Sequence, residues 1–96
     1  MIKHVVCFKL TEDSAKAREK AREVLTGMAG NVPQLRGIEV HVDTLRTPRS
    51  FDVMLEVLVD DWAALDAYQK DPYHCSVVKT HMHAVAEKSI AMDFEV

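Results

Sequence analysis

The segment Phe51–Val59 most restricts how this chain can fold. Its odd-numbered positions are all apolar, whereas Asp52 and Glu56 stand among the even-numbered ones. Such alternation predicts a β-strand with one fully apolar face. A strand of this kind belongs in the middle of a sheet, with neighbours on both sides and another layer covering its apolar face.

Three further segments have the two-residue period of a strand. Gly37–Thr44 alternates apolar and polar side chains, which indicates a strand with one face in water. His4–Leu10 and Ser89–Val96 are rich in β-branched and aromatic residues, and the pattern in each is too short for a helix. In the first of these, His4 shares a face with Val6 and Phe8, and we expect that face to lie against helices.

Three segments have helical periodicity: about Asp13–Met28, Trp62–Gln69, and Pro72 to about Glu87. Pro72 lacks a backbone N–H and suits the first position of a helix, and Asp71 before it suits the N-cap. The last helix should therefore begin at Pro72 and turn one apolar face inward. The residues predicted on that face are His74, Val77, Val78, His81 and Val85.

The resulting order β-α-β-β-α-β predicts one α+β domain over residues 1–96 with a ferredoxin-like fold and a four-stranded antiparallel sheet. The helices can cover only one face of this four-stranded sheet. The other face still carries apolar side chains, namely Val5, Cys7, Met54 and Leu58. Because exposed apolar patches mark interaction sites, we predict a homodimer that forms through this face.

Composition excludes several classes of partner. The net charge is −3 and no basic tract exceeds two residues, which argues against nucleic-acid binding. No apolar run is long enough for a membrane span, and the glycines are too scattered for a phosphate-binding loop, so we expect no nucleotide cofactor. Cys7 and Cys75 have no paired spacing and are typical of buried thiols in a reducing compartment, so we expect a cytoplasmic protein.

Three stretches carry a resemblance to a known family: the opening Met-Ile-Lys-His-Val-Val-Cys-Phe-Lys-Leu, the central Asp71-Pro72-Tyr73-His74, and the closing Ala-Met-Asp-Phe-Glu. Over essentially its whole length the chain resembles the stress-responsive A/B barrel (Dabb) family of dimeric α+β barrels. The resemblance implies a ferredoxin-like fold that dimerises through its sheets, with a small-molecule pocket between sheet and helices. Members range from stress proteins without an assigned activity to the olivetolic acid cyclase type.

The cyclase-type members use a tyrosine and a histidine together in an aldol-type ring closure of a linear polyketide. By spacing, these residues fall on Tyr68 and His74, and a histidine of the first strand falls on His4. The family often has His-Pro-x-His at the helix junction, whereas Asp71 stands here in place of the first histidine. Asp71 can still cap the helix, but any chemistry that needs the first ring would be lost.

These residues suggest a site above the sheet in which His74 takes a proton and Tyr68 hydrogen-bonds a carbonyl oxygen, with His4 beside them. We expect the apolar walls to include Phe8, Trp62, Leu65, Val77 and Val78, with His81 deepening the pocket. The alternative is a non-catalytic structural or binding protein of the stress response. In that case Tyr68 and His74 would bond each other or a backbone carbonyl and hold the helix junction together.

A second polar set, Glu39, His41 and Asp43, recurs at alternate positions of one strand. These residue types are acceptable ligands for a divalent metal, and three donors with an open position would suit zinc. Polar alternation on a wet strand face produces the same pattern without a metal. We therefore predict no metal site.

Overall fold

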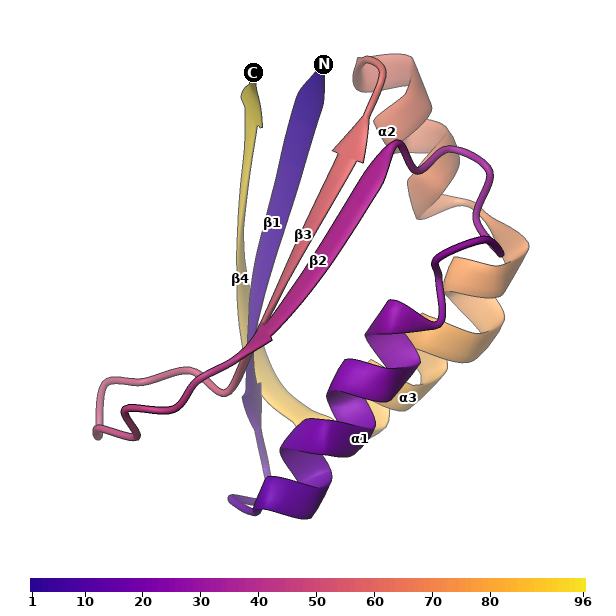
Figure 1. Ribbon diagram of the computed structural model, residues 1–96. Coiled ribbons are helices and arrows are strands. Elements are labelled where there is room, and N and C mark those ends of the chain that lie inside the picture. The colour runs from indigo at the N-terminus through magenta and orange to yellow at the C-terminus, as the bar shows by residue number, and fades with distance from the viewer.

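The computed structural model describes residues 1–96 and confirms the predicted ferredoxin-like α+β fold. The strands are β1 (Ile2–Leu10), β2 (Gly37–Val42), β3 (Val53–Val59) and β4 (Ala86–Glu95), and the helices are α1 (Ala15–Thr26), α2 (Trp62–Gln69), the π-helical segment η1 (His74–Lys79) and α3 (Thr80–Val85). All helices lie on one face of the sheet, and the other face is bare (Figure 1). None of the helices is long and apolar enough to cross a lipid bilayer.

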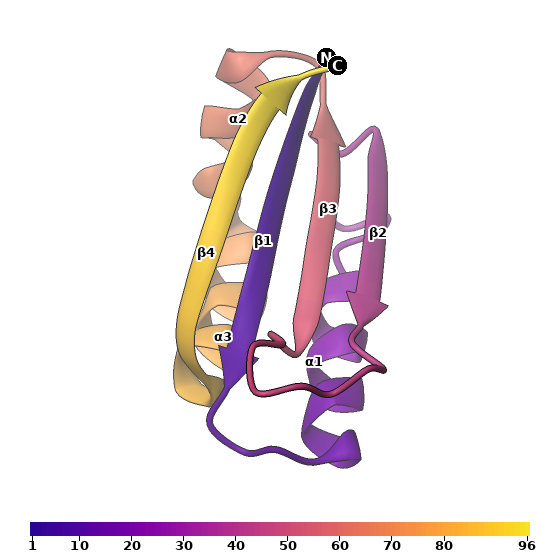
Figure 2. The same ribbon diagram turned by 90° about the vertical axis from the view of Figure 1, so that its left-hand side faces the viewer.

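The sheet has the order β2-β3-β1-β4, and all its pairs are antiparallel. The bare face is turned toward the viewer in Figure 2, with β2 and β4 at its edges. As predicted, β3 is central, and its apolar face is almost fully buried: Val53, Leu55, Val57 and Val59 are each at most 2% exposed. The two chain ends meet at one end of the sheet, where the amide N of Val96 bonds the carbonyl of Met1.

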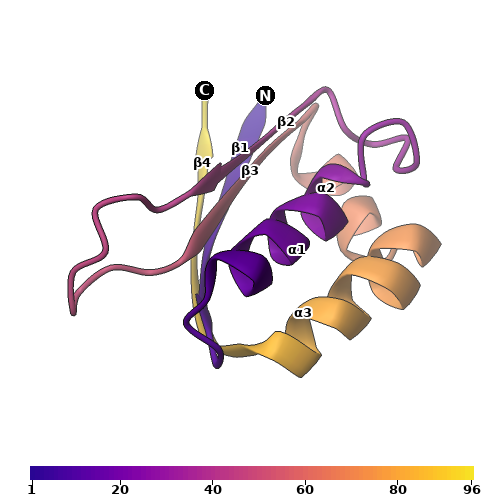
Figure 3. The same ribbon diagram turned by 60° about the horizontal axis from the view of Figure 1, so that its bottom comes forward.

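Helix α1 supplies much of the layer that covers this buried face. Ser14 caps it, since its hydroxyl accepts from the backbone N–H of Ala17 at 3.0 Å. Its inward stripe contributes Ala21 and Leu25, and Met28 follows in the turn after the helix; all three have no exposed surface. Figure 3 shows α1 beside α3, and together the two helices roof the sheet.

The junction between α2 and the last helical run has the predicted cap. Asp71 is buried, and its Oδ1 accepts from the backbone N–H groups of Tyr73 and His74 at 2.9 and 3.1 Å. This carboxylate therefore satisfies two amide groups that the start of a helix leaves without partners.

The inward face of the last helix differs from the prediction. A π-helical turn is wider than an α-helical one, so η1 shifts every later residue around the helix axis. The buried residues are His74, Val78 and Met82, four positions apart, whereas Val77 is 42% exposed and His81 is only half-buried. The prediction of Val77 and His81 on the inward face, made from a regular 3.6-residue period, is wrong.

Some element boundaries also differ. Strand β3 begins at Val53 rather than Phe51, because Asp52 turns its polar groups toward β1. Its backbone N–H donates to the carbonyl of Phe8, and its carboxylate accepts from the backbone N–H of Leu10. Strand β4 begins at Ala86 rather than Ser89, directly after α3 ends. Its first residues pair with the end of β1 across an irregularity in the register between Lys9 and Leu10.

Candidate functional site

A cavity of about 380 Å³ lies between the sheet and the helices. This volume falls within the range of small-molecule sites. The sheet contributes His4, Val6 and Phe8 from β1, Leu55 from β3 and Ala91 from β4. The helical side contributes Leu25, Tyr68, His74, Val78, Met82 and His83. The cavity therefore has mostly apolar walls and a few polar groups, four of them aromatic rings that carry a titratable atom.

His4 is fixed by a partner on the neighbouring strand. The register of β1 and β4 places His4 opposite Asp93, and His4 Nδ1 hydrogen-bonds Asp93 Oδ1. A carboxylate can only accept, so Nδ1 carries a proton and donates it to Asp93. The imidazole is buried, whereas the Asp93 side chain is 34% exposed.

Tyr68 and His74 meet at a sulfur atom. The Tyr68 hydroxyl lies 3.7 Å from Met28 Sδ, and His74 Nδ1 lies 3.3 Å from the same sulfur. The two rings pack with their centroids 4.3 Å apart, and the ring of His4 meets Tyr68 edge-on at 5.8 Å. Because a thioether is a weak acceptor, these contacts hold the phenol and the imidazole in place without strong hydrogen bonds.

Burial sets the protonation of these rings. Desolvation lowers the pKa of His74 to about 4, assisted by the nearby charges of Lys79 and His4 and opposed by Asp71. Desolvation also raises the pKa of the Tyr68 phenol well above its usual value, and Asp71 adds to the effect. At neutral pH the site therefore contains a neutral His74 and a protonated Tyr68.

Two ring nitrogens remain available to a ligand. Nε2 of His4 and Nε2 of His74 have no hydrogen-bond partner within the chain. The one buried side-chain nitrogen or oxygen without a partner is Gln34 Oε1, so both Nε2 atoms keep some accessible surface. Tyr68, by contrast, has no exposed surface. A molecule in the cavity would therefore meet the two imidazoles first.

The family model of the stress responsive A/B barrel domain (Dabb) matches residues 2–96. The chain belongs to the Dabb family. This match covers nearly every residue and includes the strands and helices that enclose the cavity. No curated protein matches the sequence.

Solved structures share the fold of this Dabb domain at low sequence identity. A dimeric ferredoxin-like protein of unknown function from Thermobifida fusca is 18% identical, with a TM-score of 0.84 over 99% of this chain and 90% of that one. A Dabb family protein from Mesorhizobium loti is 22% identical, with a TM-score of 0.72 over 99% and 95%. A hydroxynitrile lyase from Passiflora edulis is 14% identical, with a TM-score of 0.81 over 99% and 92%.

The structure brings together the three rings that sequence reasoning selected, but only part of the expected wall. Phe8 and Val78 line the cavity of this Dabb domain. Trp62 is 51% exposed at the start of α2, Leu65 packs into the core, and the π-helical turn carries Val77 away from the cavity. His81 also lies outside the lining, where Met82 and His83 take its place.

Sequence reasoning missed two polar contacts of the site. Asp93 alternates with Ser89 and Ala91, so the sequence pattern assigns all three to one face of the last strand. The pattern does not fix the pairing register with β1, and it is this register that brings Asp93 opposite His4. Met28 stands at the end of the first segment with helical periodicity, about Asp13–Met28. Nothing in the sequence indicated that its sulfur would lie between a phenol and an imidazole.

Proposed function

We propose that the cavity binds a small, largely apolar carbonyl compound and that the domain promotes a proton transfer on it. The observation that supports this proposal most strongly is the pair of imidazole Nε2 atoms, from His4 and His74, that open into one apolar cavity of about 380 Å³. A neutral imidazole beside an apolar binding site is suited to removing a proton next to a carbonyl group.

His4 is the better base of the two. Asp93 holds the Nδ1–H and would stabilise the imidazolium that forms when Nε2 takes a proton. The pKa of His74, lowered to about 4, makes it a weaker base than the sequence suggested. In this scheme the C–H bond beside the carbonyl breaks, its proton moves to His4 Nε2, and the electron pair delocalises onto the carbonyl oxygen as an enolate.

Tyr68 is the donor for that oxygen. Its raised pKa keeps the phenol protonated, and its only hydrogen-bond partner is the weak acceptor Met28 Sδ at 3.7 Å. A carbonyl oxygen that becomes an enolate is a stronger acceptor, so the hydroxyl would turn from sulfur to ligand. General-base catalysis contributes about 10²–10⁴ in rate, and an oxyanion donor about 10²–10³.

A second candidate function is binding without turnover, as in a non-catalytic protein of the stress response. The full burial of Tyr68 favours this alternative, because the hydroxyl is sealed until a ligand displaces the Met28 contact. Both functions need the same cavity. They differ in whether bound ligand loses a proton to the protein.

The test is a thermal-shift screen of small dialkyl and aryl alkyl ketones against the full chain, followed by NMR of each hit in D₂O. Turnover predicts exchange of the ligand's α-protons at a rate that His4→Gln lowers by about 10²-fold or more. His81→Gln is the matched control, since His81 is half-buried outside the cavity. Binding without exchange would support the second function, and a screen without hits would contradict both.

We further propose that the domain works as a homodimer joined through the bare face of the sheet. Beside the predicted Val5, Cys7, Met54 and Leu58, β4 adds large exposed side chains to this face: Ile90 is 58%, Met92 70% and Phe94 38% exposed. Water contact with so much apolar surface is unfavourable, and a second copy of the same face would remove it. The Thermobifida fusca neighbour is described as dimeric.

A further inference from the structure

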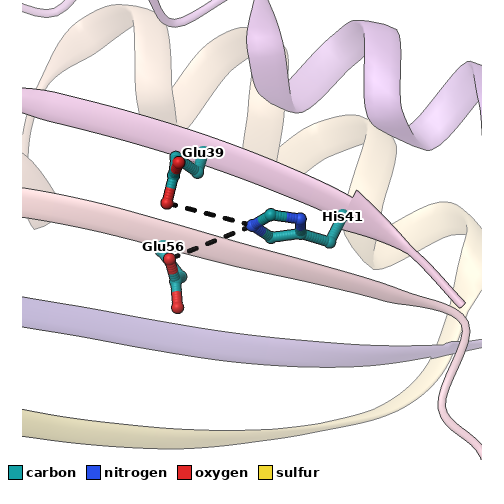
Figure 4. Close-up of side chains that lie close together, drawn as sticks. All are labelled: Glu39, His41 and Glu56. Carbon is teal, nitrogen blue, oxygen red and sulfur yellow. Dashed lines mark ion pairs between the residues drawn. The ribbon is translucent and has the colours of Figure 1, made fainter.

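Three potential metal ligands converge on the bare face of the sheet, on the side opposite the cavity. Glu39 and His41 stand two positions apart on β2, and Glu56 comes from β3 (Figure 4). One ligand atom from each lies within 4.8 Å of the others. We propose that Glu39, His41 and Glu56 bind a divalent transition metal of the zinc type.

The set differs from the one that the sequence suggested. Asp43 lies beyond the end of β2, and its carboxylate accepts from the backbone N–H and the guanidinium of Arg46 at 2.9 and 3.2 Å. Its place is taken by Glu56, which the register of β2 and β3 puts directly opposite Glu39. Only the pairing of the two strands brings this third ligand in, so no single segment of the sequence reveals it.

The two negative charges of this cluster, on Glu39 and Glu56, favour the binding of a cation. Carboxylates directly opposite each other on neighbouring strands repel. No lysine or arginine forms an ion pair with Glu39 or Glu56; His41 is the only partner, with Nε2 at 3.9 Å from Glu39 Oε2 and 4.0 Å from Glu56 Oε2. The imidazole therefore lies between two carboxylates, farther from each than a hydrogen bond allows.

The distances between the three ligand atoms would suit a zinc ion after the side chains move slightly toward one another. Zinc bonds imidazole nitrogen and carboxylate oxygen at about 2.0–2.2 Å, which in tetrahedral geometry sets the ligand atoms roughly 3.4 Å apart. The present separations of 3.9 and 4.0 Å exceed this by little. The Glu39 side chain is 67% exposed and free to rotate inward, whereas Glu56, at 22%, is held more firmly.

The residue types narrow the choice of metal. An imidazole favours zinc, copper, nickel or iron over magnesium and calcium, which prefer oxygen ligands throughout. Three protein ligands leave a fourth position for water or for a group from outside the chain. This site is independent of the proposed cavity chemistry, because the two lie on opposite faces of the sheet.

The experiment is isothermal titration of chelator-treated full-length protein with ZnCl₂, in a Cys75→Ser background that removes the exposed thiol. We expect one zinc per chain, with affinity lowered about tenfold or more by His41→Gln and by Glu56→Gln. His81→Gln is the control and should bind as tightly as the parent. NMR of the histidine rings should show the His41 resonances shifting or broadening on addition of zinc, while those of His4 stay unchanged.

Two results would overturn the proposal. One is the lack of saturable zinc binding in the parent protein. It would mean that the two carboxylates are stabilised by a protonated His41 ring and not by a metal ion. The other is equal affinity in the parent and in His41→Gln, which would place the metal elsewhere on the chain. Circular dichroism and size-exclusion chromatography of each variant would verify that the fold and the proposed dimer are retained, because the three ligands lie on the sheet face that the dimer would use.

Discussion

Tyr68 and His74 pack with ring centroids 4.3 Å apart, yet no hydrogen bond joins them. Each directs its polar atom to the sulfur of Met28 instead. Sequence reasoning had offered a bond between the two rings, or to a backbone carbonyl, as the structural alternative to catalysis. The actual contact is weaker than either, so both rings keep hydrogen-bonding capacity that a ligand can use.

Replacing Met28 by Leu tests whether this sulfur matters as an acceptor. The substitution nearly conserves volume, but it leaves the buried Tyr68 hydroxyl without a partner, so we expect a loss of about 1–3 kcal/mol in the free energy of unfolding. Met82→Leu is the matched control, because Met82 is equally buried and makes no polar contact. Urea denaturation measures both. Adding Tyr68→Phe to Met28→Leu should recover much of the loss; equal losses in the two single variants would refute the role of the sulfur.

The lowered pKa of His74 predicts a specific dependence of stability on pH. The group has a pKa near 4 in the folded chain and about 6.5 when unfolded, so between these values the unfolded chain binds more protons. The stabilisation is complete above pH 6.5 and is lost as the pH falls toward 4. Between pH 7 and pH 4.5 the wild type should lose about 2 kcal/mol more than His74→Gln. Urea titrations at several pH values measure this difference, and parallel curves would contradict the assignment.

Asp71 should contribute more to stability than an ordinary cap. Asp71→Ala leaves two backbone N–H groups of a buried helix start without an acceptor, so we expect a loss of about 2 kcal/mol. The control is Asp61→Ala at the start of α2, where an exposed carboxylate accepts one N–H, from Ala64 at 2.8 Å. Its loss should be about 1 kcal/mol or less. Thermal denaturation would rank the two, and equal losses would show that burial adds nothing to the cap.

The pair of His4 and Asp93 makes a prediction for NMR. In the wild type, two-bond proton–nitrogen spectra should show His4 protonated at Nδ1. In Asp93→Ala this preference should disappear, while stability changes by less than about 1 kcal/mol because the carboxylate is partly exposed. If the tautomer persists in the variant, the ring is held by a group other than Asp93. The proposal that His4 is a better base than His74 would then fail.

The sequence predicted the fold well because the alternation in Phe51–Val59 and the cap at Asp71–Pro72 are local signals that the tertiary structure reinforces. It predicted which rings approach one another but not how they are held. His4 meets Asp93, and Glu39 meets Glu56, through strand pairing, and neither register is encoded locally. The π-helical turn has no sequence signature of its own, so a regular period misplaced Val77 and His81.

The bare face gives the last prediction, which concerns assembly. Met92 is 70% exposed at the centre of the apolar part of β4, so in a dimer joined through this face it would be buried. A glutamate there would lose its hydration without gaining a partner, which costs several kcal/mol. We therefore expect the wild type to be a dimer by light scattering coupled to size-exclusion chromatography, and Met92→Glu to be a monomer.

Leu45→Glu is the matched control for this experiment. Leu45 is an apolar side chain that is 79% exposed in the connection between β2 and β3, away from the centre of the bare face. It should remain dimeric and as stable as the wild type, because a glutamate at an exposed position keeps its water. Dissociation of both variants would point to a general effect of added negative charge on a chain that already carries −3. A monomeric wild type would refute the interface itself.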